Sequence, residues 1–382
     1  MSRVNVLMID PWGGASGQSH YIDGLCSGLS ERVSVTLVTA KSFGITPNGY
    51  DLLKWFFPIS DSIGIQGKGR KLIRGIEYFL CYLKILAFTR KESIDIVHIQ
   101  WFLMPKTDNL FVSKIKRYCK RVIYTSHNAI SHQGKEDFKS RLSLYNKIDK
   151  ILFHGKAIEK EFLEYYPSCE GKTSIQLHGY YSNQSTRYDL ENIPKTLTGK
   201  CESCRRLYLF YGLQFFNKGV DRLINIWNSC PLNNESLLVI AGKIQGEYKE
   251  LAAARQNPSR NIEFVDGFAP DDVMNYLISK SAIVLMPYRH ASMSGVVFCS
   301  AEFSKPVLCT NAGAFSEYVV NGVTGYVVEN EDTAFADKLC QIDRMVDDST
   351  LEELGKNNFK HIRDNCDWKT IAKKLMREDY CL

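Results

Sequence analysis

A lysine and a serine–glycine loop in the C-terminal half have the chemistry to bind an anionic group. Lys218 stands where a helix is expected to begin. Ser294, Gly295 and Val296 follow the apolar run 282–286 and open another expected helix. The first N–H groups of a helix have no intrahelical partner and carry partial positive charge, so such a loop can seat a phosphate or diphosphate. We expect this loop and Lys218 to cooperate in one site.

The alternative for both features is structural. Strand–loop–helix units occur in every α/β domain, and most of them bind nothing. Lys218 could be a solvated loop lysine, but its position directly before the next helix favours a binding role. Gly212 ends the strand expected at residues 207–211 and belongs to the same upstream segment.

A glycine-rich turn follows the first expected strand, at residues 4–9. It contains Gly13 and Gly14 and leads into a helix that carries His20 and Tyr21. Its spacing is not G-x-G-x-x-G, and the strand at 34–39 lacks the acidic residue that grips a ribose. Dinucleotide binding is therefore disfavoured, and we expect the glycines to let the backbone approach another ligand.

Two further loops begin where strands end. Trp101 follows the strand at 95–100, and His127 and His132 follow the strand at 121–126. Ligands of doubly wound sheets bind beyond the carboxyl ends of strands, so these histidines are placed to contact substrate hydroxyls. A metal would need a third ligand, and the neighbouring sequence offers none. We expect no metal and no resident cofactor.

Composition indicates a soluble globular protein of two domains. The chain has 382 residues, of which 45% are hydrophobic and 24% charged. No signal peptide or membrane span is expected, and the 12 scattered cysteines are read as reduced cytosolic thiols. Residues 1–190 hold 26 basic and 17 acidic side chains, against 22 and 25 in the remainder. The positive charge of the first half favours an anionic partner, which would be either a lipid surface or a phosphorylated acceptor. Nucleic acid is the weaker choice.

Strands alternate with helices in both halves, which predicts two parallel sheets. Besides those given above, strands are expected at residues 150–154, 174–178, 237–241, 262–265, 307–310 and 325–328. Residues 180–205 lack periodicity and are expected to form a linker. The last helix, about residues 368–380, is expected to fold back on the first domain.

A basic amphipathic helix is expected at residues 68–92. Its apolar positions recur at helical spacing, and Lys and Arg stand at both ends. The simpler interpretation is a core-facing helix with solvated ends. The functional alternative is a patch that rests on an anionic membrane.

Several segments in combination resemble the GT-B glycosyltransferases of family four, in particular bacterial surface-polysaccharide and O-antigen enzymes. They are the glycine turn with Ser19-His20-Tyr21, residues 96–102, 125–132, 211–224, 238–242 and 265–267, Pro287-Tyr288 through Val296, Lys305-Pro306-Val307, and Gly313 through Gly325. The resemblance implies two Rossmann-like, doubly wound parallel-sheet domains facing an inter-domain cleft. It places the acceptor domain at 1–190, with 367–382 packed back on it, and the nucleotide-sugar domain at 191–366.

The resemblance also implies the roles of particular residues. The enzyme is expected to be a cytosolic hexosyl- or glycosyltransferase that is retaining and metal-independent, and the inner face of the membrane is a candidate location. Its partners would be a UDP- or GDP-type sugar and a lipid-linked saccharide acceptor. Catalytic roles fall on His127 and Lys218. The expected donor contacts are Gly212, Lys218, Arg289, Ser294, Gly295, Val296 and Glu317, and the expected acceptor contacts are Gly13, Gly14, His20, Tyr21, Trp101 and His132.

This sequence departs from the family pattern at three positions. Phe215 replaces an arginine, and the two motif glutamates fall on Ala291 and Cys299. Arg289 is a candidate replacement for the arginine, whereas Glu302 lies one turn beyond Cys299 and is not assumed to substitute. Two alternatives therefore stay open: a GT-B sugar-nucleotide epimerase or hydrolase, and a non-catalytic glycan-binding partner subunit.

Overall fold

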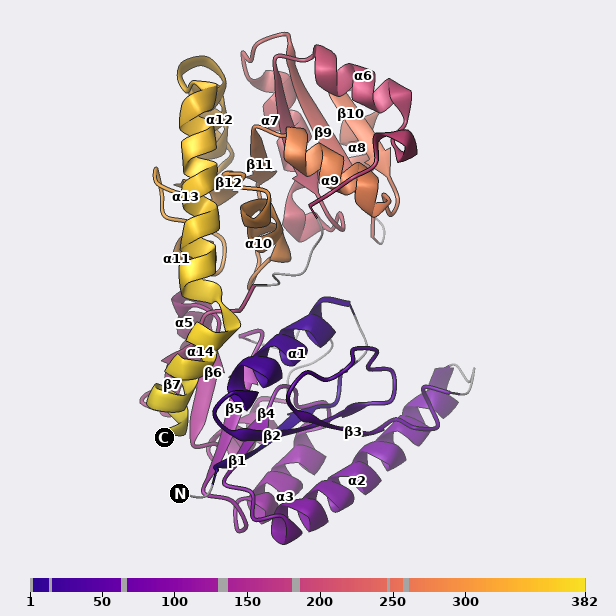
Figure 1. The fold of residues 1–382 in the computed structure, drawn as a ribbon, viewed down its shortest axis with the longest axis vertical. Helices are drawn as coiled ribbons and strands as arrows, with labels where there is room; N and C mark the ends of the chain where they lie inside the picture. The colour runs from indigo at the N-terminus through magenta and orange to yellow at the C-terminus, as the bar shows by residue number, and fades with distance from the viewer. Residues whose placement is uncertain are drawn as a thin grey trace. The chain divides into compact units, whose positions relative to one another are not determined.

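The computed structural model describes residues 3–13, 16–62, 67–129, 137–180, 186–245, 248–256 and 261–381. The chain divides into two compact units, Met1–Tyr180 with Asn365–Leu382, and Tyr181–Asp364. Each unit is built on its own parallel sheet, and its ribbon can be followed in Figure 1.

The first unit contains a seven-stranded sheet in the order β3-β2-β1-β4-β5-β6-β7. Its strands are β1 (Asn5–Asp10), β2 (Ser34–Ala40), β3 (Asp51–Phe56), β4 (Ile96–Ile99), β5 (Arg121–Ser126), β6 (Lys150–Phe153) and β7 (Thr173–Ile175). In β1, Leu7 pairs with Thr36 on one side and with Val97 on the other. The strands on either side of β1 come from different stretches of the chain, so the sheet changes winding direction there.

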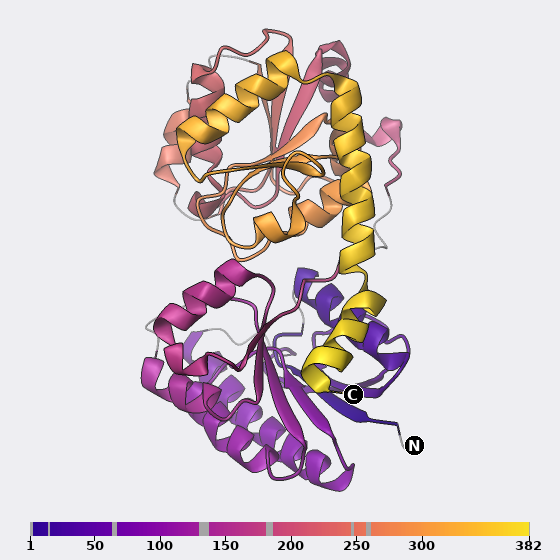
Figure 2. The same ribbon diagram turned by 90° about the vertical axis from the view of Figure 1, so that its left-hand side faces the viewer.

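Helices cover both faces of this sheet. They are α1 (Ser16–Ser30), α2 (Gly67–Lys91), α3 (Pro105–Ile115), α4 (Phe138–Tyr145), α5 (Lys156–Tyr165) and α14 (Trp368–Leu375), with a π-helical turn at Met376–Tyr380. Figures 1 and 2 show α1 and α14 on one face, and α2, α3 and α4 on the other. The apolar strands are buried because both of their faces are covered.

The second unit contains a six-stranded sheet in the order β10-β9-β8-β11-β12-β13. Its strands are β8 (Arg206–Tyr211), β9 (Ser236–Gly242), β10 (Ile262–Asp266), β11 (Ile283–Met286), β12 (Val307–Thr310) and β13 (Gly325–Val328). Its helices are α6 (Lys195–Ser203), α7 (Val220–Ser229), α8 (Lys249–Arg255), α9 (Asp271–Lys280), α10 (Gly295–Glu302), α11 (Phe315–Tyr318), α12 (Asp332–Met345) and α13 (Asp348–Cys366). The winding direction changes between β8 and β11, where doubly wound sheets bind their ligands.

The predicted strands are confirmed, with ends that shift by a few residues. Two elements differ from the sequence prediction. The edge strand β3 was not expected, and α6 lies inside the segment predicted as a linker. Leu197 and Cys201 of α6 are buried, so packing of these two side chains outweighs its weak helical pattern.

Candidate functional site

The turn that carries Lys218 is fixed against the end of β11. Lys218 closes a short 3₁₀ turn, Phe216–Lys218, and Gly219 follows in the left-handed conformation with φ 68°. A Cβ atom at Gly219 would collide with the carbonyl oxygen of Pro287. Glycine is therefore required for the lysine turn to pack this closely.

The Lys218 ammonium is half-buried and lies on an aromatic ring. Its Nζ is 3.9 Å from the ring centroid of Tyr288. Among the described residues, no carboxylate forms an ion pair with it. Burial lowers the pKa of Lys218 to about 8, so the side chain carries its charge at neutral pH. It is thus a cation available to an incoming anion.

Tyr288 connects this lysine to the start of α10. The Tyr288 hydroxyl lies 3.3 Å from Oγ of Ser294, which is the N-cap of α10. Ser294 Oγ accepts a long hydrogen bond, 3.4 Å, from the N–H of Val296. A Cβ built on Gly295 would meet no atom within 4 Å, so the space beside the first turn is open. Lys218 and Ser294, the N-cap of α10, therefore share one neighbour, Tyr288, which places the ammonium in the same cluster as the start of that helix.

The other expected donor residues lie in the same unit as this loop. Gly212 lies at the carboxyl end of β8 with φ 113°, and its N–H donates to the Ala241 carbonyl. Glu317 is half-buried in α11, and its N–H donates to the Ala314 carbonyl. The N–H of Ala314 in turn donates to the Ser292 carbonyl at 3.2 Å. The Glu317 segment is thus attached to the loop that precedes α10.

Arg289 is held by a carboxylate of its own unit. Its Nη1 and Nη2 atoms lie 2.8 Å from Oδ1 and Oδ2 of Asp221, and its guanidinium stacks on Phe216 at 4.3 Å. Nη1 also donates to the Phe216 carbonyl at 2.9 Å. The backbone N–H of Arg289 donates to the Asn217 carbonyl, so the pair ties the Lys218 turn to the end of β11. Lys218 is left as the cation of this cluster without a carboxylate partner among the described residues.

In the first unit, His127 lies in a cluster at the carboxyl ends of the strands. Its ring stacks on Trp101 with centroids 4.6 Å apart and an interplanar angle of 9°. Its Nε2 lies 3.1 Å from Oε1 of Gln100, and its Nδ1 lies 3.2 Å from Nε2 of His154. Burial and the neighbouring histidines hold the pKa of His127 well below its usual value. The ring is therefore neutral at physiological pH.

The hydrogen bonds of His154 fix the tautomers of this pair. His154 Nδ1 lies 3.0 Å from the carbonyl oxygen of Gln176, which can only accept, so Nδ1 carries the proton. The neutral ring then accepts at Nε2 from the Nδ1–H of His127. The neutral ring of His127 then has its lone pair on Nε2. Oε1 of Gln100 can only accept, so the 3.1 Å contact becomes a hydrogen bond when the Gln100 amide is turned and its N–H donates to Nε2.

Tyr21 joins the histidines to the C-terminal helix. Its ring centroid lies 5.1 Å from that of His127, 4.7 Å from that of His178 and 5.3 Å from that of Trp368. Burial lowers the pKa of His178 to about 3 and that of His154 to about 4. The cluster is thus a set of neutral, aromatic groups with hydrogen-bonding edges, suited to sugar hydroxyls and ring faces.

The remaining acceptor residues are divided between described and undescribed parts of the chain. Gly13 has φ 33°, and a Cβ there would collide with Thr39 and Ala40. Asp10 lies three residues before Gly13. Its carboxyl group is buried, and this burial raises its pKa to about 6. His20 is exposed on α1. Gly14 and His132 lie outside the described residues.

Comparison with known proteins finds a family match within the second unit and two distant relatives of most of the chain. Residues 205–344, within the second unit, match the family model of the group 1 glycosyl transferases. A protein of Klebsiella pneumoniae described as an uncharacterized 41.2 kDa protein in cps region is 22% identical over 72% of this chain and 74% of its own length. An uncharacterized glycosyltransferase of Methanocaldococcus jannaschii is 22% identical over 78% of this chain and 79% of its own.

Solved structures share the whole fold. Sucrose-phosphate synthase of Thermosynechococcus elongatus superposes with a TM-score of 0.70 at 16% identity, over 99% of this chain and 100% of that one. HepE of Anabaena in complex with UDP gives 0.70 at 14% identity over the same shares. WaaG, a glycosyltransferase involved in lipopolysaccharide biosynthesis, gives 0.61 at 17% identity over 97% and 98%. The chain therefore has the GT-B fold.

Within this GT-B-type chain, the departures from the family pattern have structural consequences. Ala291 is buried, and Cys299 is half-buried beside Tyr211. Glu302 is the last residue of α10, seven positions after Gly295 and therefore roughly 10 Å along the axis from the helix start. It is too far along the helix to replace a carboxylate at the Ser294 loop.

Three residues of this GT-B-type chain were missed by sequence reasoning. His154 and His178 were read only as strand ends, and Asp221 was included only as part of the segment 211–224 that carries the resemblance. The signal for the histidines was present, because each lies just beyond a strand at the same edge of the sheet. No sequence signal pairs Asp221 with Arg289, which is 68 residues away.

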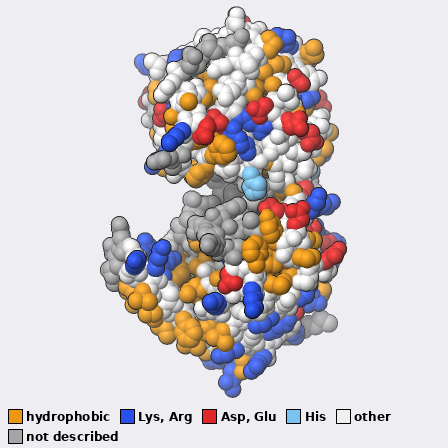
Figure 3. Space-filling view, turned by 180° about the vertical axis from the view of Figure 1, so that it is seen from behind, with side chains coloured by type: hydrophobic (Ala, Val, Ile, Leu, Met, Phe, Trp, Pro, Cys, Tyr) orange, Lys and Arg blue, Asp and Glu red, His pale blue; other side chains and the backbone are white. Residues whose placement is uncertain are grey.

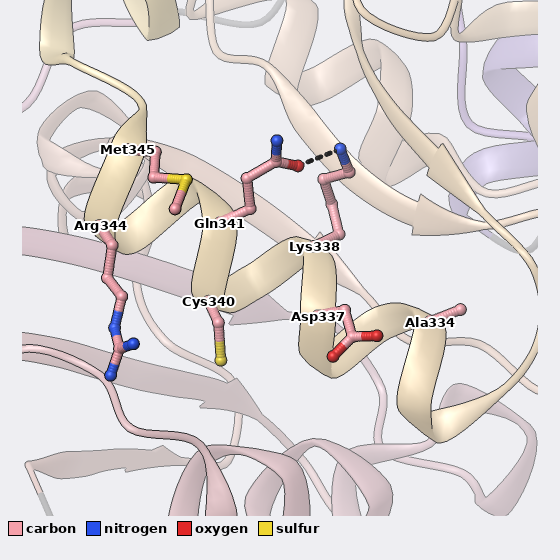
Figure 4. Close-up of a pocket in the computed structure, with 7 residues that line it drawn as sticks. All are labelled: Ala334, Asp337, Lys338, Cys340, Gln341, Arg344 and Met345. Atoms are coloured by element: carbon pink, nitrogen blue, oxygen red, sulfur yellow. Dashed lines mark hydrogen bonds between the residues drawn. The ribbon is translucent and has the colours of Figure 1, made fainter.

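A hollow along α12 of the second unit is a weaker candidate site. It is lined by Ala334, Asp337, Lys338, Cys340, Gln341, Arg344 and Met345, all on one helix (Figure 4). Lys338 there donates to Oε1 of Gln341 at 2.5 Å. None of the predicted site residues lies in it, and we assign it no role in sugar transfer.

Proposed function

We propose that this chain transfers a sugar from a UDP- or GDP-type donor to a lipid-linked or oligosaccharide acceptor in bacterial surface-polysaccharide synthesis. The reaction retains the anomeric configuration, needs no metal and takes place at the cytoplasmic face of the membrane. The GT-B type of the chain and the cps-region and lipopolysaccharide relatives support this assignment. The UDP complex of HepE supports a nucleotide-diphosphate donor.

The Lys218–Tyr288–Ser294 cluster carries the proposal. As the bond between the sugar C1 and the diphosphate oxygen breaks, negative charge grows on the diphosphate. The Lys218 ammonium and the N–H groups of Gly295 and Val296 would stabilise that charge. Gly212 would allow the nucleotide to approach the backbone, with Glu317 on the nucleotide side. A single preorganised donor of this kind contributes about 2.7–4 kcal/mol to the transition state.

The first unit would hold the acceptor and the reacting sugar. His127, neutral and stacked on Trp101, would lie beside the donor sugar. Gly13, Gly14, His20, Tyr21 and His132 would bind the acceptor. Arg289, already bound to Asp221, would orient the Lys218 turn as well as attract the donor.

The test is a screen of nucleotide sugars followed by a turnover assay. A donor at a hundredfold excess over its Kd should raise the free energy of unfolding by about 2.7 kcal/mol, which a thermal shift reads. Glycosyl transfer requires that the chosen donor be consumed when a lipid-linked acceptor is added. Donor turnover without any acceptor would instead support an epimerase or hydrolase.

A non-catalytic partner subunit is the second candidate, because Ala291 and Cys299 stand where the family has glutamates. This role predicts glycan binding with no consumption of any nucleotide sugar. Binding of a donor that is then turned over would exclude it.

A further inference from the structure

The long helix α2 of the first unit has two apolar faces. Its inner face is buried through Tyr78, Cys81, Tyr82, Ile85 and Thr89. The opposite face carries five large apolar side chains that are 42–68% exposed: Leu72, Ile76, Phe79, Leu80 and Leu83. Their spacing confines them to a stripe roughly 100° wide along the helix. We call these five residues the α2 stripe.

The predicted core-facing helix therefore describes only one of the two apolar faces of α2. The inner face satisfies that interpretation. On the stripe, Phe79 packs edge-to-face on Phe111 of α3, and all five side chains nevertheless stay 42–68% exposed. Scattered apolar side chains on a surface need no explanation, whereas a continuous stripe over several turns indicates an interaction site. Figure 3 shows these hydrophobic side chains gathered along α2, with Lys and Arg near both ends.

The charges around the stripe are almost all positive. Helix α2 contains seven Lys and Arg residues and one acidic residue, Glu77. Glu77 is buried and accepts from the backbone N–H groups of Ile59 and Ser60. Arg70 and Arg74 pair with Asp61. Four exposed or half-exposed cations remain without a carboxylate partner among the described residues: Lys68, Lys71, Lys84 and Arg90.

The surface continues beyond α2. Met104, which is exposed, lies with its methyl group 3.8 Å from the position of a Cβ on Gly75. At the other end, Leu83, Leu86, Ala87, Arg90 and Lys91 line a groove with Tyr118. The Arg90 guanidinium lies 5.8 Å from the Tyr118 ring. An aromatic ring with a polar hydroxyl and neighbouring cations is a common combination where a protein meets lipid headgroups.

We propose that the α2 stripe rests on an anionic membrane, with its apolar side chains among the acyl chains and its cations at the headgroups. No helix in the described residues is long and apolar enough to cross a bilayer, so the contact is interfacial. A second copy of the chain fits poorly, because both ends of α2 are basic and either pairing direction brings like charges together. The surface instead matches a partner that is both apolar and anionic.

Vesicle binding of the full chain tests this proposal without any reference to its enzymatic reaction. Wild type is sedimented with vesicles of phosphatidylcholine alone and with vesicles containing equal parts of phosphatidylglycerol, at low and high salt. The test variant is Ile76→Asp/Leu80→Asp, at positions 54% and 51% exposed. The control is Met345→Asp, which places one such carboxylate at a 79% exposed apolar side chain on α12 (Figure 4). Circular dichroism and a thermal melt confirm that each variant folds.

We expect wild type and Met345→Asp to bind the anionic vesicles, to bind less at high salt, and to leave neutral vesicles largely unbound. The double variant should lose roughly tenfold or more in partitioning, because two acidic groups replace buried apolar contacts. Equal binding by wild type and the double variant would overturn the proposal. So would an absence of binding to anionic vesicles, or a stable dimer in light scattering that the double variant dissociates.

Discussion

Nδ1 of His127 lies 3.2 Å from Nε2 of His154, and this contact determines the tautomer of the His127 ring. The Gln176 carbonyl places the His154 proton on Nδ1, so His154 accepts from His127 and leaves the lone pair of His127 on Nε2. His154 is fully buried behind this ring. We therefore regard it as a positioning residue for His127.

The first prediction concerns this pair. His154→Leu removes the acceptor for His127 Nδ1–H and frees the ring to change tautomer, so the transfer rate should fall by roughly tenfold to a hundredfold. His154→Gln keeps an acceptor oxygen and should restore part of the rate. Initial rates at saturating donor measure both variants. Equal rates for the two would show that His154 only fills space.

The second prediction concerns the charge of Lys218. The pKa of this group is lowered to about 8, so its charged form is lost as pH rises through that value. Donor affinity should therefore fall above pH 8. In Lys218→Arg the guanidinium stays charged, so the affinity that remains should not fall over this range. Donor KM measured from pH 7 to 9.5 checks this. An equal rise of KM above pH 8 in wild type and in Lys218→Arg would contradict the prediction.

A third prediction separates Arg289 from direct donor binding. Its two guanidinium nitrogens bind Asp221, so Asp221→Ala and Arg289→Ala should both loosen the Lys218 turn. Each single variant should weaken donor binding, and the double variant should be little worse than either alone. A double-mutant cycle on donor Kd measures this coupling. Additive losses would indicate that Arg289 contacts the donor independently of Asp221.

The fourth prediction concerns stability in acid. His98 is buried, with Nδ1 2.8 Å from the Tyr380 hydroxyl and Nε2 2.8 Å from the Thr125 hydroxyl. Burial lowers its pKa from 6.5 to about 3. The unfolded chain therefore gains this proton before the folded chain does, and the stability contribution present above pH 6.5 is lost as pH falls toward 3.

One such histidine accounts for a slope of at most about 1.4 kcal/mol per pH unit in the free energy of unfolding. In His98→Gln that slope should be smaller by this amount between pH 6 and 4, although the variant is less stable at neutral pH. Urea unfolding at three pH values measures it. An unchanged slope would mean that His98 is protonated in the folded chain.

Much of the architecture could be predicted from the sequence, because central parallel strands are buried on both faces and form continuous apolar runs. The edge strand β3 escaped because Lys54 interrupts its run and its residues are only partly buried. Helix α6 escaped because Thr198 and Gly199 weaken its helical pattern. In both cases the surroundings, rather than the local sequence, determine the element.

The candidate site was predictable where chemistry and chain position coincide. Lys218 and Ser294 each precede a helix, so their placement at helix starts followed from the sequence. Their common contact with Tyr288 did not, because it depends on how two strands are packed. The same holds for His154, which meets His127 only because β5 and β6 are neighbours in the sheet.

The central claim is that Lys218 and the start of α10 bind the diphosphate of the donor, and calorimetric titration with UDP and GDP tests it most directly. Wild type should bind one of them, and Lys218→Ala should lose roughly a hundredfold in affinity. The control variant Lys338→Ala should bind as wild type does. It removes a lysine whose Nζ also lies over a tyrosine ring, 5.1 Å from the centroid of Tyr326. Equal affinities for wild type and Lys218→Ala would contradict the account.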